Sequence, residues 1–196
     1  MGESGMSEVG FRRAWTAVVL KQAPMIAPAR RYTYPRVVAG EEDAMARGAL
    51  ELMVRVEDGG EFLATCALGF RGAEMPTGMW GCPEAREMCA VAGGYAYVID
   101  TARPEVSTHV GLRPVVELRE VVGSGLLVFA GFHTVAAWGR GAMAWETGRL
   151  SWEGVRMGAV EGDVLHGFGW DVRTDRELPF TVDLRTGEHA GGGFLR

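Results

Sequence analysis

The sequence predicts a mainly β fold: an antiparallel meander, a sandwich or partial propeller-like sheets, with one short helix near residues 83–92. Short segments rich in β-forming residues recur along the chain, and turns containing Gly or Thr-Gly separate them. The 196 residues include 29 glycines, a number that many tight turns explain. Within 116–119, apolar and charged residues alternate, as in a strand with one face in water.

The N-terminal residues set the expected domain boundary. Residues 1–10 are small, polar and glycine-rich without periodicity, so we expect a disordered tail, followed by a single β-rich globular domain over 11–196. The first strand is expected within 14–20. Prolines between residues 21 and 35 then remove backbone donors, which favours an extended connection or an edge.

A β-hairpin is expected next. The segments 49–56 and 61–70 are apolar and rich in β-forming residues, and they flank Glu57-Asp58-Gly59-Gly60. Asp-Gly tolerates the positive φ angles of a tight turn, so it is a strong hairpin signal.

The segment 82–92 is the one candidate helix. Pro83 suits the first helical position, and Glu84 and Glu87 complement the N-terminal end of the helix dipole. Gly93-Gly94 supplies a C-terminal stop. Apolar residues at positions 85, 88, 89 and 92 share one face at helical spacing.

The rest of the chain is expected to form short strands joined by tight turns. Such spacing is typical of an antiparallel meander folded into a sandwich, a barrel or propeller-like sheets. The expected strands cover residues 95–100, 108–122, 126–132, 135–138, 142–145, 150–155, 158–160, 164–170 and 179–184.

Three tryptophans, Trp138, Trp145 and Trp152, recur at intervals of seven residues. Glycines between them argue against a helix, and two-residue Gly turns would instead produce a three-stranded meander. In that register Trp145 lies opposite Ala136, and strand parity places all three indoles on one face. We predict that they are mostly buried. The alternative is a stacking platform for a sugar or a base, which makes all three candidates for binding.

Residues 142–152, Ala-Met-Ala-Trp-Glu-Thr-Gly-Arg-Leu-Ser-Trp, resemble the Ala…Thr-Gly…Trp turn of quinoprotein-type β-propeller repeats. A second partial copy lies over 182–188, 39 residues further on, close to the length of one blade. The resemblance implies propeller-like sheets. A closed propeller needs about four blades or more, so a chain with two such copies is not expected to close one by itself. No quinone follows from the resemblance, and we expect no cofactor.

Charge and composition exclude several classes of partner. The formal net charge is −5 and the pI ≈ 5.4, whereas nucleic-acid-binding proteins concentrate positive charge, so we expect no nucleic acid. No apolar run approaches the roughly 20 residues that cross a bilayer, so we expect no membrane association. Three cysteines do not suit a secreted disulfide framework, which favours the cytoplasm. Lys21 is the only lysine, a skew typical of a GC-rich bacterial genome.

No catalytic motif is recognisable. The histidines are scattered, with no His-x-x-x-His or Cys-x-x-Cys spacing, so we expect no metal. His133, His166 and Asp171 are the candidate site residues outside the tryptophans. Aspartates at strand ends are expected mainly to accept hydrogen bonds from backbone amides. Cys82 and Cys89 are expected to be buried thiols, and the alternative is a nucleophile beside a histidine.

Two functions follow from these observations. We expect a non-enzymatic bacterial module that binds a protein partner through its loops or a sheet edge. The alternative is a small ligand-binding or hydrolase-like enzyme that uses the scattered histidines and aspartates. A deep polar pocket lined by two or more histidines would favour the enzyme, whereas an exposed apolar patch would favour the binding module.

Overall fold

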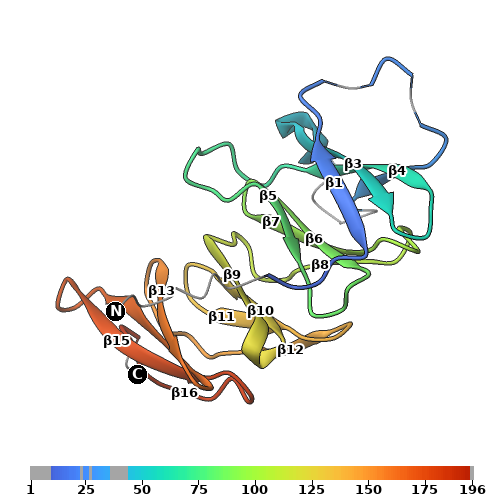
Figure 1. Cartoon of the computed structure of the whole chain (residues 1–196). Helices are drawn as coiled ribbons and strands as arrows, with labels where there is room; N and C mark the ends of the chain where they lie inside the picture. The colour runs from blue at the N-terminus through green and yellow to red at the C-terminus, as the bar shows by residue number, and fades with distance from the viewer. Residues whose placement is uncertain (1–9, 23, 27, 36–43, 195–196) are drawn as a thin grey trace, which may run out of the picture.

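The fold is mainly β, as predicted. The computed structural model describes residues 10–22, 24–26, 28–35 and 44–194, so residues 1–9 of the predicted tail lie outside the described part. Its strands form four sheets of four strands each (Figure 1). Two short 3₁₀ turns, η1 (Ala44–Arg47) and η2 (Val122–Ser124), are the helical elements of the described residues.

Sheets A and B come from the N-terminal half. In spatial order, sheet A contains β1 (Trp15–Val19), β3 (Ala49–Val56), β4 (Glu61–Ala67) and β2 (Arg31–Tyr34). Sheet B is a simple meander of β5 (Gly78–Gly81), β6 (Glu87–Ala92), β7 (Tyr95–Asp100) and β8 (Ser107–His109). All pairings are antiparallel except β2 with β4, which is parallel and makes β2 an edge strand within the predicted extended connection.

Sheets C and D come from the C-terminal half, and both are antiparallel meanders. Sheet C contains β9 (Glu117–Val121), β10 (Leu126–Ala130), β11 (Val135–Trp138) and β12 (Met143–Glu146). Sheet D contains β13 (Val155–Glu161), β14 (Val164–Asp171), β15 (Arg176–Asp183) and β16 (His189–Gly191).

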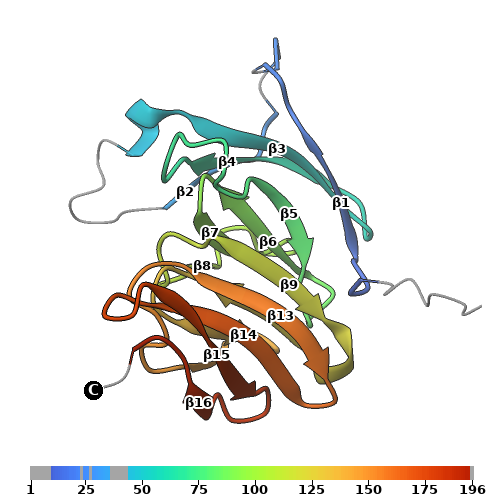
Figure 2. The same cartoon turned by 90° about the vertical axis from the view of Figure 1, so that its left-hand side faces the viewer.

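The four sheets stack face to face in the order A, B, C, D (Figures 1 and 2). One apolar core lies in each of the three seams: Leu52 and Met88 meet between A and B, and Cys89 and Phe129 between B and C. The third core lies between C and D. The stack stays open, because no core of the described residues joins sheet A to sheet D. It therefore resembles a run of propeller blades that does not close, in agreement with the prediction.

The predicted hairpin is confirmed. Strands β3 and β4 pair antiparallel around the Asp58-Gly59 turn, with Val54 opposite Phe62. Gly59 has a φ of 86°, a left-handed conformation that glycine adopts without a steric penalty. The second strand ends at Ala67 rather than at Phe70.

The predicted helix over 83–92 is wrong. Residues 83–86 form a turn, and residues 87–92 form strand β6 in the middle of sheet B. Both faces of β6 are buried, with Met88 facing sheet A and Cys89 facing sheet C. A strand covered on both faces carries apolar residues at every position, so its period of two disappears and a helical spacing fits by accident.

The predicted common face for the three tryptophans is also wrong. Trp138 pairs with Met143, but Trp145 lies opposite Ala137 rather than the predicted Ala136, because a bulge shifts the register between β11 and β12. One extra residue in a strand moves the following side chains to the other face. The indole of Trp138 therefore joins the core between sheets B and C, and that of Trp145 the core between C and D.

Most of the remaining predicted strands are present. Those over 95–100 and 135–138 match β7 and β11 to the residue, and 126–132, 142–145, 164–170 and 179–184 overlap β10, β12, β14 and β15. The range 108–122 contains only the shorter β9 and the last two residues of β8. The strand predicted over 150–155 is wrong: residues 147–154 cross the seam between sheets C and D as a loop, and β13 begins at Val155.

Candidate functional site

The six predicted site residues do not gather at one place. Trp138 and Trp145 are 3% and 9% exposed, which confirms their burial, but they occupy different seams. Trp152 is 37% exposed, so the prediction that it is mostly buried is wrong. Its ring lies 4.9 Å from that of Phe194, and the Arg149 guanidinium lies 4.7 Å from both ring centres. This arginine covers the Trp152 ring by a cation–π contact, which leaves less of the ring free for stacking a ligand.

The two candidate histidines are equally separate. His133 lies after β10, with its Nδ1 3.2 Å from the carbonyl oxygen of Ser151, and it lines a surface pocket of about 320 Å³. His166 lies on β14 with its Nε2 3.7 Å from a carboxylate oxygen of Glu161. None of the four pockets described in the structure is lined by more than one histidine, so none of these four has the arrangement expected of the histidine-based enzyme.

Asp171 is buried at the end of β14, where it closes a turn. Its side chain accepts hydrogen bonds from the Thr174 hydroxyl at 2.8 Å and from the backbone amide of Arg173 at 3.1 Å. These donors favour the ionised carboxylate and lower the pKa of Asp171. Asp100 and Asp183 accept from backbone amides two and three residues ahead in the same way. The prediction that aspartates serve their own turns is confirmed for these three residues.

The cysteines are buried thiols, as predicted. Cys66, Cys82 and Cys89 are all free and at most 1% exposed. Burial raises the pKa of each thiol well above its ordinary value, because the thiolate loses its hydration. A thiol in this state is a poor nucleophile at neutral pH.

One face of sheet D has no protein layer against it among the described residues. Strand β14 alternates buried residues such as Leu165, which face the core, with partly exposed Val164, His166, Phe168 and Trp170 on the other side. Figure 2 views the stack from the side of this sheet, with its strands in the foreground. We call this outer surface of β13 to β16 the D face.

A groove of about 390 Å³ runs over the D face. Phe168 and Pro179 are cross-strand partners on its floor, and Ala190 of β16 forms one side. The Arg156 guanidinium lies 4.5 Å from the Phe168 ring centre and donates to Glu177 Oε2 at 2.6 Å. This hydrogen bond lowers the pKa of Glu177 and raises that of Arg156, so the two stay paired along one rim.

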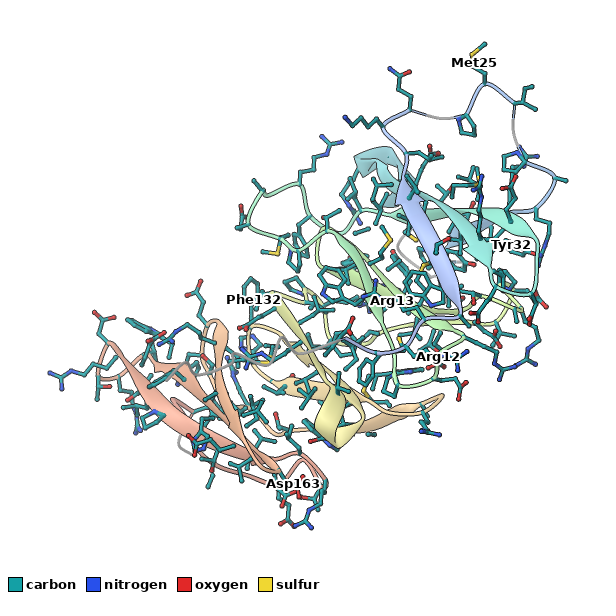
Figure 3. The ribbon with its side chains drawn as sticks, in the orientation of Figure 1. Arg12, Arg13, Met25, Tyr32, Phe132 and Asp163 are labelled. Carbon is teal, nitrogen blue, oxygen red and sulfur yellow. The ribbon has the colours of Figure 1, made fainter. Side chains whose placement is uncertain are left out.

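Acidic side chains occupy one end of the D face, where two turns meet. Glu161 ends β13 and Asp163 lies in the turn after it, while Asp183 ends β15 and Glu188 lies in the connection to β16. One guanidinium, that of Arg185, lies 3.6 Å from carboxylate oxygens of both aspartates. Asp163 is labelled in Figure 3, which shows its place at this end of the sheet.

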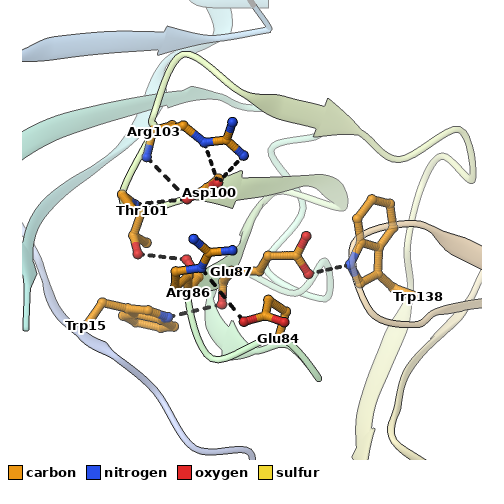
Figure 4. Close-up of polar contacts among 9 residues, drawn as sticks. Trp15, Glu84, Arg86, Glu87, Asp100, Thr101, Arg103 and Trp138 are labelled. Carbon is orange, nitrogen blue, oxygen red and sulfur yellow. Dashed lines mark hydrogen bonds and ion pairs between the residues drawn. The ribbon is translucent and has the colours of Figure 1, made fainter.

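A second surface site is a polar pocket of about 250 Å³ at the seam between sheets B and C (Figure 4). The turn before β6, strands β7 and β8, and the turn after β11 all contribute to its wall. Its charged lining consists of three carboxylates and three guanidinium groups, from Glu84, Glu87, Asp100, Arg86, Arg103 and Arg140.

Glu87 is the half-buried carboxylate of this pocket. Its Oε2 accepts a hydrogen bond of 2.8 Å from the Trp138 indole, and the backbone amide of Gly141 also donates to the side chain. Burial raises the pKa of Glu87 in spite of these two donors, with smaller contributions from Glu84 and Asp100. Its main-chain oxygen accepts from the Trp15 indole at 3.0 Å, so one residue links sheets A, B and C.

Sequence reasoning missed Phe168 and Glu87 as site residues. In 164–170 the larger residues His166, Phe168 and Trp170 alternate with glycines, and this period of two was the available signal for the D face. The pattern does not reveal which face of the sheet lacks a neighbour. Glu87 was placed on a helix, where it would not meet Trp138. Within the described residues, no three His, Cys, Asp or Glu side chains converge as a metal site requires, and none of the helical elements has the length and apolar character to cross a membrane.

Comparison with known proteins gives no identification: no protein-family model matches the chain, and no curated protein matches its sequence.

Proposed function

We propose that this protein is a non-enzymatic binding module that engages a protein partner through the D face. The observation that carries the proposal is the partly exposed apolar floor of the groove, formed by Phe168, Pro179 and Ala190. Apolar surface with aromatic residues is typical of the centre of protein–protein interfaces. Sheets B and C have apolar cores on both faces, whereas the D face has none among the described residues.

Charge defines the chemistry of the partner. The acidic end of the D face, with Glu161 and Asp163 exposed, favours a partner that carries lysine or arginine there. We therefore propose an extended partner segment with apolar side chains in the groove and a basic flank over the acidic turns. Nucleic acid is a poor candidate, since phosphates would meet this acidic end.

The experiment uses a random-peptide phage library panned against the purified protein. Enriched peptides are synthesised and their binding is measured by fluorescence anisotropy. We expect them to combine apolar and basic residues and to bind less tightly as salt rises. Phe168→Ala should weaken binding by about tenfold or more, which is the loss expected for an interface hot spot.

Val18→Ala is the matched control, because Val18 is an exposed apolar residue on sheet A, 64% exposed, at the far end of the stack. It should leave peptide affinity unchanged. Equal weakening by both variants, or no enrichment, contradicts the proposal. Light scattering on the free protein tests whether a second copy of this chain occupies the D face. If the free protein is a dimer and Phe168→Ala dissociates it, the D face binds another copy, and the proposal of a different partner protein is wrong.

The cysteines support a reducing compartment for this function. All three are free thiols, and none is exposed to form an intermolecular disulfide. We therefore propose that the module acts in the cytoplasm, and the arginine-rich, lysine-poor composition supports a bacterial source.

A further inference from the structure

The pocket between sheets B and C has an uneven pattern of charge pairing. Arg103 donates from Nε and Nη2 to Asp100 Oδ2 at 3.1 and 3.0 Å, while both backbone amides at 102 and 103 donate to Oδ1 (Figure 4). Arg86 lies 3.8 Å from Glu84. Glu87 and Arg140 remain, and neither has an ion-pair partner among the described residues.

Glu87 is held in place but has acceptor capacity left. A carboxylate offers about four lone-pair sites, and the Trp138 indole and the Gly141 amide occupy two of them. Burial raises the pKa of Glu87, because desolvation disfavours the ionised form, and no positive charge of the described residues pairs with this carboxylate. An ammonium group entering the pocket would supply that charge.

Arg140 lines the same pocket as Glu87 but comes from a different sheet connection. It lies in the turn between β11 and β12, directly before the Gly141 whose amide binds Glu87. Its side chain is exposed and lines the same pocket. A guanidinium presents a planar fork of donors that matches a carboxylate in a bidentate manner.

We infer that this pocket binds a small zwitterion, a free α-amino acid, with its ammonium group on Glu87 and its carboxylate on Arg140. The balanced lining decides between ligand classes. A simple anion would meet three carboxylates, and a simple cation would meet three guanidinium groups. A ligand that carries both charges offers a partner of opposite charge to each of the two unpaired groups that line the pocket. The pocket of about 250 Å³ has room for a molecule of this size.

The wall of the pocket also suits the amino-acid side chain. Val106 is 47% exposed at the rim, and Ser107 and Thr108 follow it with hydroxyl groups. This part of the wall offers one apolar and two polar contacts beyond the charged groups. It is therefore the part of the pocket expected to distinguish one amino acid from another.

The test uses the full chain and a panel of free L-amino acids, screened by saturation-transfer NMR and quantified by isothermal titration calorimetry. We expect one or more of them to bind. The N-acetyl derivatives of these amino acids lack the ammonium group, and their amides lack the carboxylate. Each blocked derivative should bind at least about tenfold more weakly than the free amino acid, as expected when a hydrogen bond to a charged group is lost.

Two variants separate the roles of the charged groups. Glu87→Gln keeps an acceptor for Trp138 but removes the charge, and Arg140→Gln changes an exposed turn residue, so thermal melts should show both folded. Each should weaken amino-acid binding by about tenfold or more, and Val18→Ala should not. Absence of binding at millimolar amino acid, equal binding of the blocked derivatives, or unchanged affinity in either variant would overturn the inference.

Discussion

The indole nitrogen of Trp145 donates a hydrogen bond of 2.7 Å to the main-chain oxygen of Leu184. The same ring lies against Gly187, where an added Cβ atom would come within 2.9 Å of it. The first Thr-Gly segment of the sequence thus contacts the second directly, because Trp145 belongs to one and Leu184 and Gly187 to the other. This contact joins sheets C and D, and it explains why a glycine follows Thr186.

Replacement of Trp145 by alanine is expected to destabilise the fold strongly. The indole is 9% exposed and belongs to the core between sheets C and D, so its removal leaves a cavity and an unpaired carbonyl at Leu184. We expect a loss of about 3–5 kcal/mol in the free energy of unfolding, the usual range for large aromatic deletions in a core. Urea denaturation of Trp145→Ala beside wild type measures it.

Trp152→Ala is the matched control for that experiment. This indole is 37% exposed and contacts mainly Phe194 and the Arg149 guanidinium. We expect a loss below about 1 kcal/mol, within the range of surface substitutions. Equal losses for the two variants would contradict the assignment of Trp145 to the core.

The pKa of Glu87 predicts a pH dependence of stability. For an acid whose pKa is raised on folding, the folded state binds more protons than the unfolded state, so stability falls with increasing pH. The fall begins near the ordinary glutamate pKa and ends above the raised one. Glu87→Gln removes this titration, so its stability relative to wild type should increase across that window. Urea midpoints at a series of pH values measure the difference.

Trp138→Phe provides the complementary variant, because it removes the indole donor that favours the ionised Glu87. The pKa of Glu87 should then rise further, and the fall in stability should extend to higher pH. Identical pH profiles for wild type and Glu87→Gln would show that the Glu87 carboxyl does not titrate differently in the folded protein.

Strand positions were predictable where one face of a sheet meets solvent or where a turn has a strong signal. The Asp58-Gly59 hairpin and strand β14 are examples of each. The stacking of four sheets removed that signal at residues 87–92, which lie in the middle of sheet B and are covered on both sides. A buried run such as 88–92 fits a strand or a helix equally well until its neighbours are known.

The candidate site depended on information that a single sequence does not contain. Glu87 and Trp138 are 51 residues apart and meet only because sheets B and C pack face to face. The predicted common face for the three tryptophans was wrong for a local reason. The bulge opposite Ala137 and Trp138 adds one residue to the pairing, so the side chains beyond it lie on the opposite face. Composition did identify an acidic chain, but the clustering of acids at one end of sheet D follows from the pairing of β14 with β15.

Glu120 is expected to anchor the segment around Phe11 and Arg13 to sheets B and C. Its Oε2 accepts from the backbone amide of Phe11 at 2.8 Å, and its Oε1 accepts from Gly81 at 2.7 Å and from Arg13 Nη2 at 3.0 Å. Glu120→Gln places an amide NH₂ among these donors, so one of them loses its acceptor. We expect the free energy of unfolding to fall by about 1–3 kcal/mol. We also expect faster proteolysis near Phe11, which mass spectrometry of the fragments measures.

Glu153→Gln is the control for that substitution, because the Glu153 side chain is exposed and makes no side-chain hydrogen bond within the described part of the chain. It should change stability by less than about 0.5 kcal/mol. Unchanged proteolysis in Glu120→Gln would argue against the anchoring role.

Gly169→Ala is expected to disturb the packing of the 147–154 loop on sheet D. A Cβ atom at Gly169 would lie 2.2 Å from the Leu150 carbonyl oxygen and 3.2 Å from the Gly193 amide nitrogen, which are themselves hydrogen-bonded at 2.7 Å. Both neighbours are backbone, so they move only if the loop or the C-terminal segment shifts, and we expect a loss of about 1–3 kcal/mol. Gly111→Ala is the control, since nothing lies within 4 Å of its added Cβ atom. Thermal melts of the two variants measure the difference. Equal melting temperatures would mean that the backbone at Leu150 does not pack against β14, which would contradict the path of the 147–154 loop across the seam between sheets C and D.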